Sequence, residues 1–422
     1  MSEMSKASEN LLPVVLGGDI GVYAIGRSFN EAFDCRVLCV GNSPIEPITR
    51  SVFFDVEPIA AGATDEDYLA VLEKVAAEHP GRSLVLMANQ DGQSAMIARN
   101  AARLQAAGYA LPFPSVEAQE MLTDKAKFAE VCESLGVDTP RTVVVDFRDA
   151  DAGEWEAPSI PFAFPVVAKA ANGEPYEKVS FEGKRKIWFI ETAEELAGLW
   201  TSLRGAGFRD TFLVQELIPG DNTCMRSITM YVDSKGKCTL VGSARVLLED
   251  HAPTMIGNPV AMITEPFEDL WAAAEKILGK AGYSGFANFD VKVDPRDGRA
   301  VFFEVNPRIG RNSYYMTAAG ANPMAPMVED LVDGISGDDA RRREVREEIL
   351  YSLVPNRLLL RYVRDAQLKT RVASLIARRR VKNPLVYSKE TSVRRRAVVA
   401  GLTLNHYRKF KKYYPKPTDE SF

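Results

Sequence analysis

Histidine and cysteine are scarce in this chain of 422 residues, which contains three of the former and five of the latter. The five cysteines are scattered without a C-x-x-C pair, so neither a disulfide framework nor a cysteine-based zinc site is expected. The histidines, His79, His251 and His406, are too dispersed for a zinc site or for Ser-His-Asp catalysis. Thiols of this kind fit a reducing, cytoplasmic environment.

Long apolar runs are also missing from the sequence. No stretch approaches the roughly 18 uncharged apolar residues of a transmembrane helix. The first residues lack the basic and apolar regions of a signal peptide, which again favours a cytoplasmic protein. Hydrophobic residues make up 46% of the chain and charged residues 26%, as in ordinary globular proteins. A chain of this length exceeds one hydrophobic core, so we expect several domains.

The N-terminal part alternates short apolar runs with stretches of helical spacing, beginning with "LLPVVLGGDIGVYAIGRSFNEAF". Strands that alternate with helices predict a parallel α/β domain, which we assign to residues 1–120. Ligands of such sheets bind beyond the carboxyl ends of the strands. The polar or small residues at those ends are Gly18, Asp19, Asn89 and Asp91.

Two further residues follow in the first helical stretch, Tyr23 and Arg27. We expect both of them, together with Gly18 and Asp19, to contact a substrate. Helix capping by Asp19 and packing of Tyr23 and Arg27 would explain the same residues nearly as well, so this alternative stays open.

A predicted hairpin, "GFANFDVKVDPRDGRAVFFEVNPR", spans residues 285–308. Its central turn residues, 294–298, would place Asp290 opposite Glu304 and bring Asn306 onto the same face. The alternation of a strand also predicts that Phe303 and Val305 point into the core. Carboxylate and amide oxygens side by side suit Mg²⁺, whereas an exposed polar face balanced by Lys292 is the alternative interpretation.

Four elements follow one another in order: Lys125 at a helix start, Lys169 at the end of "FPVVA", the stretch "QELIPGD", and the hairpin with "FFEVNPR". As a set, they resemble the ATP-grasp carboxylate–amine ligases, two-lobed enzymes that bind ATP between the lobes. The resemblance implies a fold of mixed α/β and α+β class. The implied divisions are a small lobe over 121–214, a large lobe with the metal site over 215–335, and a basic, mainly helical region over 336–422.

The resemblance also implies a role for each motif residue. Residues expected to bind ATP are Lys125, Lys169, Gln215, Glu216, Leu217, Ile218 and Asp221. Residues expected to hold Mg²⁺ are Asp290, Glu304 and Asn306. Residues expected to stabilise the transferred phosphoryl group or a substrate carboxylate are Arg308, Arg311 and Arg226, and His251 is expected near the substrate. The glycine-rich loop of many relatives is replaced by "AANGEPYEKVSFEGKRK", where Lys184–Lys186 would cover the phosphates instead.

Within this family, "VVLGGDIGVYAIGRSFNEAF", "LIPGDNTCMRSITMYVD" and "YSLVPNRLLLRYVRD" resemble the bacterial D-aspartate ligases. The resemblance implies that the β-carboxylate of D-aspartate is joined to the lysine side-chain amine of a peptidoglycan precursor. A ligase for another acid and amine remains an alternative, because loops shape the acceptor pocket.

Basic residues are concentrated at the C-terminal end, where residues 341–422 contain 22 Lys/Arg and 7 Asp/Glu. Such a segment predicts an anionic partner, either the inner face of a membrane or a diphosphate-bearing substrate. A solvated helical face packed on the rest of the chain is the alternative. A non-catalytic protein that binds nucleotide or nucleic acid is a third hypothesis, but no nucleic-acid motif is present and no nucleic acid is expected.

Overall fold

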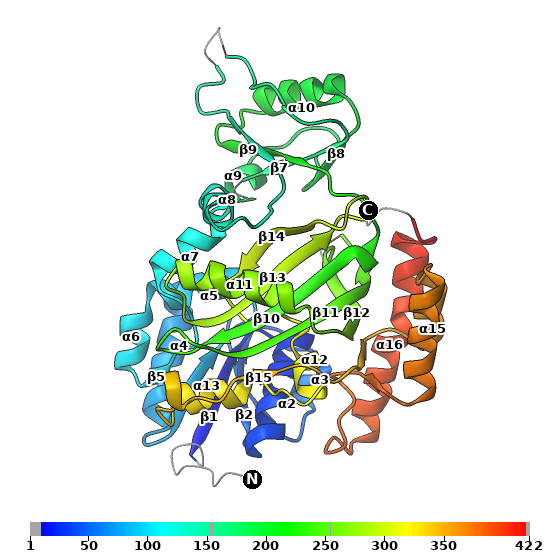
Figure 1. Cartoon of the computed structure of the whole chain (residues 1–422). Coiled ribbons are helices and arrows are strands. Elements are labelled where there is room, and N and C mark those ends of the chain that lie inside the picture. Colours follow the sequence, from blue (N-terminus) through cyan, green and yellow to red (C-terminus); the bar gives the residue numbers. More distant parts are fainter. Residues whose placement is uncertain (1–9, 152–154, 172, 254, 419–422) are drawn as a thin grey trace.

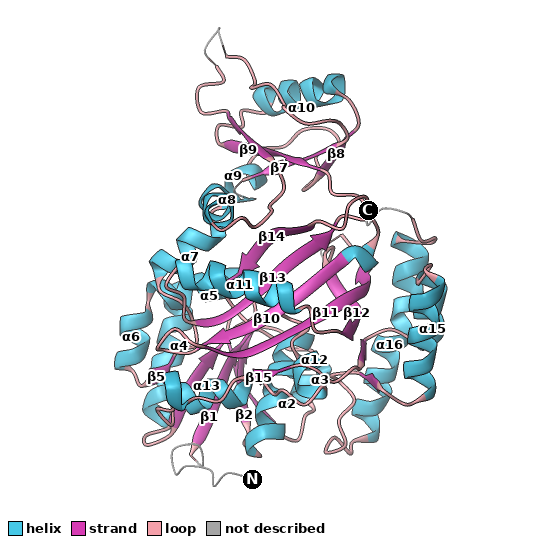
Figure 2. Cartoon of the chain, in the orientation of Figure 1, coloured by secondary structure: helices cyan, strands magenta, loops and turns pink. Residues whose placement is uncertain are grey.

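The computed structural model describes residues 10–151, 155–171, 173–253 and 255–418. The described chain contains three sheets, a five-stranded, a four-stranded and an eight-stranded one. In Figure 1, the lobe that carries the four-stranded sheet stands above the largest sheet, and the N-terminal sheet lies below it. Figure 2 shows helices packed around the two lower sheets, so the mixed α/β class expected from the sequence is confirmed.

The N-terminal sheet is entirely parallel, with the strand order β3-β2-β1-β4-β5. Its strands are β1 (Leu11–Leu16), β2 (Val37–Gly41), β3 (Phe54–Pro58), β4 (Ser83–Met87) and β5 (Tyr109–Ala110). The associated helices are α2 (Ile20–Phe33), α3 (Glu46–Thr49), α4 (Asp65–Glu78), α5 (Asp91–Arg99) and α6 (Ala101–Ala106). From β1 the chain continues to β2 on one side, and after β3 it crosses to β4 on the other side of β1. A crevice forms at the carboxyl ends of the strands where the direction reverses in this way. There Asn89 donates a hydrogen bond of 3.2 Å to Asp19, which also caps α2.

The small lobe is an antiparallel sheet with the order β6-β9-β7-β8. Its elements are β6 (Thr142–Asp146), β7 (Val166–Ala170), α9 (Gly173–Glu177), β8 (Trp188–Ile190), α10 (Ala193–Gly205) and β9 (Thr211–Glu216). Aromatic side chains, including Phe147, Trp200 and Phe212, fill the space between sheet and helix. Strand β9 runs to Glu216, so the lobe extends two residues past the expected boundary at 214.

The large sheet has the order β14-β13-β10-β11-β12-β16-β17, with β15 paired to β11. Its strands are β10 (Met225–Val232), β11 (Cys238–Asp250), β12 (Asn258–Thr264), β13 (Gly285–Val293), β14 (Ala300–Asn306), β15 (Arg343–Glu344), β16 (Leu350–Ser352) and β17 (Val381–Lys382). Three helices, α7 (Val116–Thr123), α8 (Lys125–Ser134) and α11 (Glu268–Lys280), pack on this sheet through one core that includes Phe128, Trp271 and Phe289. Helix α8, which carries Lys125, is therefore anchored to the large sheet, although the sequence assigned it to the small lobe.

The predicted hairpin forms between β13 and β14 in the expected register, with Asp290 opposite Glu304 and Asn288 opposite Asn306. The expectation that Phe303 points into the core is wrong. The register shifts after Asp290, so that Val291 pairs with Phe302 and Phe303 is the extra residue of a β-bulge. Phe302 takes the core position, and Phe303 is left half-buried at the edge of a pocket.

The C-terminal region is not purely helical, because β15, β16 and β17 add to the large sheet. The remaining elements after β14 are α12 (Tyr314–Ala318), α13 (Met324–Leu331), η2 (Gly337–Asp339), α14 (Asn356–Tyr362), α15 (Ala366–Ala377) and α16 (Val393–Tyr413), and η1 (Asn222–Cys224) precedes β10. Side chains of α14, α15 and α16 share one apolar core with α2 of the N-terminal domain. Among the described residues, no helix is long and apolar enough to cross a membrane.

A buried ion pair joins the C-terminal region to the N-terminal domain. Arg395 and Glu390 lie 3.4 Å apart, each with only 1% of its side chain exposed. Glu390 also accepts hydrogen bonds from Tyr23 and Ser51, and Arg395 lies 4.6 Å from the centre of the Tyr23 ring. Part of the basic region is thus packed on the rest of the chain, as one of the two alternatives held, because Arg395 is used inside the molecule.

We predict that Arg395→Met lowers the free energy of unfolding by about 3 kcal/mol, because it leaves the buried Glu390 without its charged partner. Urea denaturation followed by circular dichroism would measure the change. Arg394→Met, at an exposed position one residue away, is the matched control and should change stability by less than about 0.5 kcal/mol. Equal effects of the two substitutions would contradict a stabilising role of the buried pair.

Candidate active site

A pocket of about 440 Å³ lies between the small lobe and the large sheet, and we call it the interlobe pocket. Val167, Lys169 and Phe189 form its wall on the small lobe, and Met225, Glu249 and Asp290 form part of the opposite wall. The connection between the lobes closes one side with Gln215, Glu216, Leu217 and Ile218. The pocket thus has apolar side chains at Val167, Phe189, Leu217 and Ile218 and charged ones toward β13 and β14.

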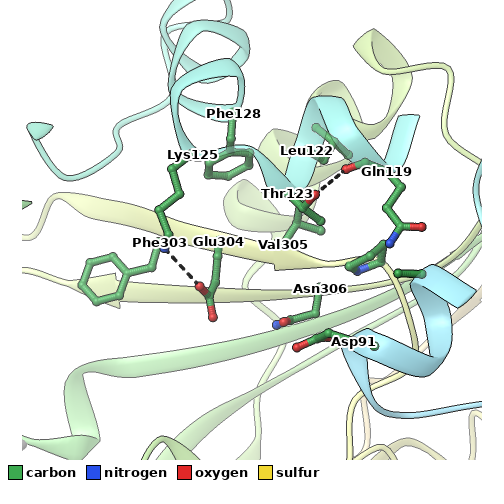
Figure 3. Close-up of a pocket in the computed structure, with 13 residues that line it drawn as sticks. Asp91, Gln119, Leu122, Thr123, Lys125, Phe128, Phe303, Glu304, Val305 and Asn306 are labelled. Carbon is green, nitrogen blue, oxygen red and sulfur yellow. Dashed lines mark hydrogen bonds and ion pairs between the residues drawn. The ribbon is translucent and has the colours of Figure 1, made fainter. Parts of the chain in front are cut away.

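Two lysines face each other across the interlobe pocket. Lys125 begins α8, where Asp124 caps the helix, and its ammonium lies 3.5 Å from a carboxylate oxygen of Glu304 (Figure 3). Lys169 projects from β7 of the other lobe. Burial, and next the positive charge of Lys125, lower the pKa of Lys169 to about 7. Two cations held close together in this way form a site prepared for a polyanion such as a triphosphate.

The end of β9, where the chain connects the two lobes, is held by hydrogen bonds of its side chains. Glu216 accepts hydrogen bonds of 3.0 Å from Arg141 and from Arg299. Burial alone would raise the pKa of Glu216, but these arginines outweigh it and lower the pKa. Gln215 donates to the hydroxyl of Thr142. The backbone is engaged as well, since the N–H of Glu216 donates to the carbonyl of Arg141 at 2.8 Å and Gln215 pairs with both Thr142 and Val167 in the sheet.

Two carboxylates meet where the interlobe pocket reaches β13 and β14. Burial, and next the charge of Glu304, raise the pKa of Asp290 to about 8. The amide of Asn306 lies 3.3 Å from Asp290. Among the described residues, no group of three or more His, Cys, Asp or Glu side chains is placed to hold a metal ion. The candidate set instead combines two mutually repelling carboxylates with one amide, a donor set that suits a hard cation.

Glu249, at the end of β11, is a site residue that the sequence reasoning missed. It lines the interlobe pocket, its side chain is buried, and burial raises its pKa to about 7. Its negative charge also contributes to the raised pKa of Asp290. Glu249 follows the apolar residues of its strand in "RVLLED", just as Glu304 follows those of "AVFFE". This similarity between the two stretches could have indicated Glu249 from the sequence.

A second pocket of about 470 Å³, the crevice pocket, adjoins the first and shares Asp290, Glu304 and Lys186 with it. It lies between β13 and β14 and the carboxyl ends of β1 and β4. Its polar lining residues are Asp19, Asn89, Gln90, Asp91, Lys186, Ser227, Asn258, Asn288, Asp290, Glu304, Asn306, Arg308, Arg311, Asn312 and Tyr351.

The two arginines of the crevice pocket are each paired with an aspartate of the N-terminal domain. Arg311 lies 2.5 Å from Asp19, and Arg308 lies 2.9 Å from Asp91. Both arginines line the pocket that also contains Asp290 and Glu304, and the charge of Arg308 lowers the pKa of Asp290 in opposition to burial. Of the predicted basic loop, Lys186 reaches both pockets, whereas Lys184 donates to the carbonyl of Val179.

A third pocket, of about 400 Å³, opens onto the same edge of β14 (Figure 3). Leu122, Phe128 and Phe303 form apolar walls, and the ion pair of Lys125 and Glu304 also lines the pocket. Phe303 can line this pocket because the β-bulge removes it from the regular strand pairing. All three pockets therefore meet at Glu304.

Some predicted site residues lie elsewhere in the structure. Tyr23 has no exposed surface, since its ring is covered by Arg395 and its hydroxyl donates to Glu390. Arg27 is buried between the rings of Tyr314 and Tyr387 and donates to carbonyls of residues 383, 384 and 386. The expectation that these two side chains contact a substrate is therefore wrong in this structure, and packing, the alternative, accounts for them.

Arg226 alternates onto the far face of β10, where its guanidinium lies 4.9 Å from the ring of Phe267 at the start of α11. Burial, and next Arg245, lower its pKa to about 10. Its neighbours Met225 and Ser227 face the pockets, so the strand's alternation turns Arg226 away from them, and a catalytic role is corrected to a packing one.

The remaining three expectations are corrected in part. Asp221, expected to bind ATP, caps η1: one of its carboxylate oxygens accepts hydrogen bonds from the backbone N–H and the hydroxyl of Thr223. Gly18 packs against Pro44, where an added Cβ would lie 2.7 Å from backbone, so it serves the turn before Asp19. His251 begins the loop between β11 and β12 and stacks on Tyr414 with ring centres 3.6 Å apart, and it does not line any of the three pockets.

Comparison with known proteins bears on the class of this site. Residues 124–329 match the family described as carbamoyl-phosphate synthase L chain, ATP binding domain. The chain is 31% identical to D-aspartate ligase of Enterococcus faecium over 419 residues, which covers 96% of this chain and 97% of the relative. The chain belongs to the ATP-grasp family of carboxylate–amine ligases. It is an ATP-dependent ligase that forms C–N bonds, and ATP is its nucleotide.

Solved structures agree with this ATP-grasp fold. An L-amino acid ligase from Bacillus licheniformis superposes with a TM-score of 0.54 at 17% identity, covering 77% of this chain and 74% of that one. The biotin carboxylase domain of Hydrogenobacter thermophilus 2-oxoglutarate carboxylase, in complex with ADP magnesium salt, superposes with a TM-score of 0.52 at 18% identity, covering 78% and 72%. Both likenesses concern the fold alone.

Proposed function

We propose that this ligase phosphorylates the β-carboxylate of D-aspartate and joins it to the lysine side-chain amine of a peptidoglycan precursor. The identity to the D-aspartate ligase of Enterococcus faecium along nearly the whole chain supports the choice of acid. The observation that carries the proposal is the crevice pocket, which holds Arg308, Arg311 and Asp19 beside the carboxylates of β13 and β14. Two cations and one anion complement a dicarboxylic amino acid, which has two carboxylates and one ammonium.

In this proposal, the ion pair of Arg311 and Asp19 is exchanged for contacts with the substrate. Arg311 would hold the α-carboxylate and Asp19 the ammonium, since the two side chains already lie 2.5 Å apart and so match neighbouring groups of opposite charge. The β-carboxylate would then point toward Arg308 and Glu304. Fixing one end of the amino acid so that the other can react is the positioning contribution to the rate.

The chemistry requires activation, because oxide is a poor leaving group. The β-carboxylate oxygen attacks the γ-phosphorus of ATP, ADP leaves, and an acyl phosphate forms. The neutral lysine amine then attacks the acyl carbon, phosphate leaves, and one proton is lost as the amide forms. ATP, acid and amine thus give ADP, phosphate and amide. Lys125, Lys169 and Arg308 would stabilise the negative charge on the transferring phosphoryl oxygens.

Mg²⁺ is proposed as the second cofactor, held by Asp290, Glu304 and Asn306. The raised pKa of Asp290 supports this, since a divalent cation removes the repulsion that the two carboxylates would otherwise exert on each other. The cation would supply charge neutralisation at the β- and γ-phosphates.

The acceptor and the setting are proposed from chemistry. A cytoplasmic precursor that carries a diphosphate would suit the basic C-terminal region, which could also contact the anionic inner face of the membrane. In either case the lysine amine must reach the acyl phosphate at Glu304, where the three pockets meet.

The proposed function is tested by measuring phosphate release from MgATP with D-aspartate, L-aspartate, D-glutamate and D-asparagine. Hydroxylamine traps an acyl phosphate as a hydroxamate, and mass spectrometry identifies the amide formed with a lysine-containing precursor peptide. A hydroxamate from D-aspartate alone is expected. Turnover with another acid alone would contradict D-aspartate as the substrate but keep the ligase chemistry. No turnover with any acid in the presence of the acceptor peptide would contradict the proposed function.

We predict that Arg311→Met raises the KM for D-aspartate about a hundredfold while the KM for ATP stays within twofold, because a charged contact to a carboxylate contributes about 2–3 kcal/mol. Arg36→Met is the matched control, since Arg36 forms an equally short pair with Asp55 on the exposed surface of the N-terminal domain. Initial-rate kinetics with each substrate varied in turn would measure both constants. An unchanged KM for D-aspartate would contradict the assignment of Arg311.

A further inference from the structure

The loop between β11 and β12 forms a wall common to the two main pockets. Its residues Ile256 and Gly257 line both the interlobe and the crevice pocket, and Met255 lines the second. The loop is closed at its base, where Asp250 pairs with Asn258 across the two strands. Ile256 is 49% exposed, an apolar side chain left uncovered between the nucleotide and the amino-acid sides of the site. The position of this short loop therefore affects both substrates.

Helix α16 contacts the base of the loop from outside the ATP-binding domain, which ends at residue 329. The ammonium of Lys409 forms an ion pair with one carboxylate oxygen of Asp250, whose side chain is only 4% exposed. The other oxygen of Asp250 accepts a hydrogen bond of 3.0 Å from the backbone N–H of Ala252, inside the loop. One buried carboxylate thus joins α16 directly to the backbone of the loop.

An aromatic stack provides a second contact next to the first. The ring of His251 lies parallel to that of Tyr414, with centres 3.6 Å apart and planes inclined by 8°. Tyr414 follows the end of α16 and is held in turn by Tyr362 of α14, whose hydroxyl donates to the Tyr414 carbonyl. Phe410 of α16 packs 5.0 Å from the Tyr362 ring. Loop residues 250–252 are therefore fixed by an ion pair and a stack, both from the C-terminal region.

We propose that α16 and the residue after it position the active site: Lys409 and Tyr414 hold residues 250–252 at the base of the β11–β12 loop and so keep Ile256 and Gly257 in the walls of both pockets. Neither Lys409 nor Tyr414 lines the interlobe or the crevice pocket. Releasing the loop would let Ile256 and Gly257 leave the pocket wall, so binding should weaken while the phosphoryl-transfer groups on β13 and β14 stay in place. The inference rests on the proposed function only in the choice of D-aspartate for the kinetic assay. The mobility of the loop can be measured without any turnover.

The test compares Lys409→Met and Tyr414→Ala with matched controls on the same helix, Lys412→Met and Tyr407→Ala, which change exposed residues. Amide hydrogen exchange followed by mass spectrometry is expected to show at least tenfold faster exchange in peptides covering residues 248–260, with β13 and β14 unchanged. The KM for the amino acid should rise about tenfold and kcat should change less than twofold, a split expected from lost binding alone. Lys409→Arg should restore both values.

Two further outcomes decide the inference. Asp250→Asn combined with Lys409→Met should be no worse than Lys409→Met alone, since the two side chains act as one unit. Unchanged loop exchange in Lys409→Met, or faster exchange spread evenly over the whole chain, would overturn the proposal. If the wild type turned over another acid, the exchange result would still stand, so failure of the proposed function and failure of this inference are distinguishable.

Discussion

Replacement of Glu304 by glutamine is expected to lower kcat for ATP turnover about a thousandfold, with Asp290→Asn causing a similar loss. The two carboxylates face each other on paired strands, and both line the interlobe and the crevice pocket. Removing one charge would weaken the hold on Mg²⁺ and the neutralisation of the phosphates, which contributes several kcal/mol to such transition states. Initial rates at saturating MgATP and D-aspartate would measure the loss.

Asp290→Asn should also stabilise the metal-free fold. The pKa of Asp290 is raised from its ordinary value to about 8, so the folded state favours the neutral carboxyl more than the unfolded state does. This group therefore contributes least to stability at high pH: its contribution falls as pH rises from about 4, the ordinary pKa of an unfolded aspartate, toward 8. Asp290→Asn removes this loss of stability, so at pH 8 the variant should melt at a higher temperature than the wild type.

Thermal melts with and without Mg²⁺ separate this interpretation from simple misfolding. Mg²⁺ should raise the melting temperature of the wild type and have little effect on Asp290→Asn or Glu304→Gln. Asp91→Asn is a useful control, because Asp91 is an exposed crevice-pocket carboxylate on α5 that is not part of the proposed metal set. Full activity in Glu304→Gln, or an unchanged response to Mg²⁺, would contradict the metal assignment.

ATP affinity is expected to fall as pH rises above 7, and Lys169 is the cause. Because its pKa is about 7 in the free protein, the side chain of Lys169 is mostly the neutral amine at pH 8. A bound triphosphate would return the pKa toward its ordinary value near 10.4, so binding would take up a proton. Affinity should then decrease by up to tenfold per pH unit above 7, until the neutral lysine contributes no more than an apolar side chain.

Two variants test this explanation. Lys169→Met should bind ATP about 30-fold more weakly at pH 6.5, because a charged hydrogen bond to phosphate is worth about 2 kcal/mol, and the difference should shrink at pH 9. Lys169→Arg keeps its charge at all these pH values and should remove the pH dependence. Lys127→Met, an exposed lysine on α8, is the matched control.

Calorimetric titration with ATP in the absence of Mg²⁺, in two buffers of different ionisation enthalpy, would count the protons taken up. Omitting Mg²⁺ keeps any proton released from Asp290 out of the measurement. Proton uptake near one per ATP at pH 8 is expected for the wild type and none for Lys169→Met. Equal affinities at pH 6.5 and pH 9 in the wild type would show that Lys169 does not contact the phosphates.

Much of the site follows from local patterns in the sequence. The turn at residues 294–298 and the alternation on either side of it predicted that Asp290 would face Glu304, and the pairing is observed. Lys169 and the residues from Gln215 to Ile218 likewise line the interlobe pocket, as their motifs predicted. Hairpin register and strand alternation depend on neighbours a few residues apart, which is why they can be predicted without a tertiary fold.

Other features depend on contacts between distant segments, and only the folded chain decided them. Tyr23 and Arg27 follow the carboxyl end of β1 in the sequence, where site residues are expected, yet the C-terminal region covers them. The β-bulge at Phe303 and the position of Arg226 under α11 are set by how the sheet packs against its helices. The pair of Lys409 and Asp250 joins residues 159 positions apart, and no local pattern of charge or hydrophobicity specifies a partner at that distance, because packing alone brings the two side chains together.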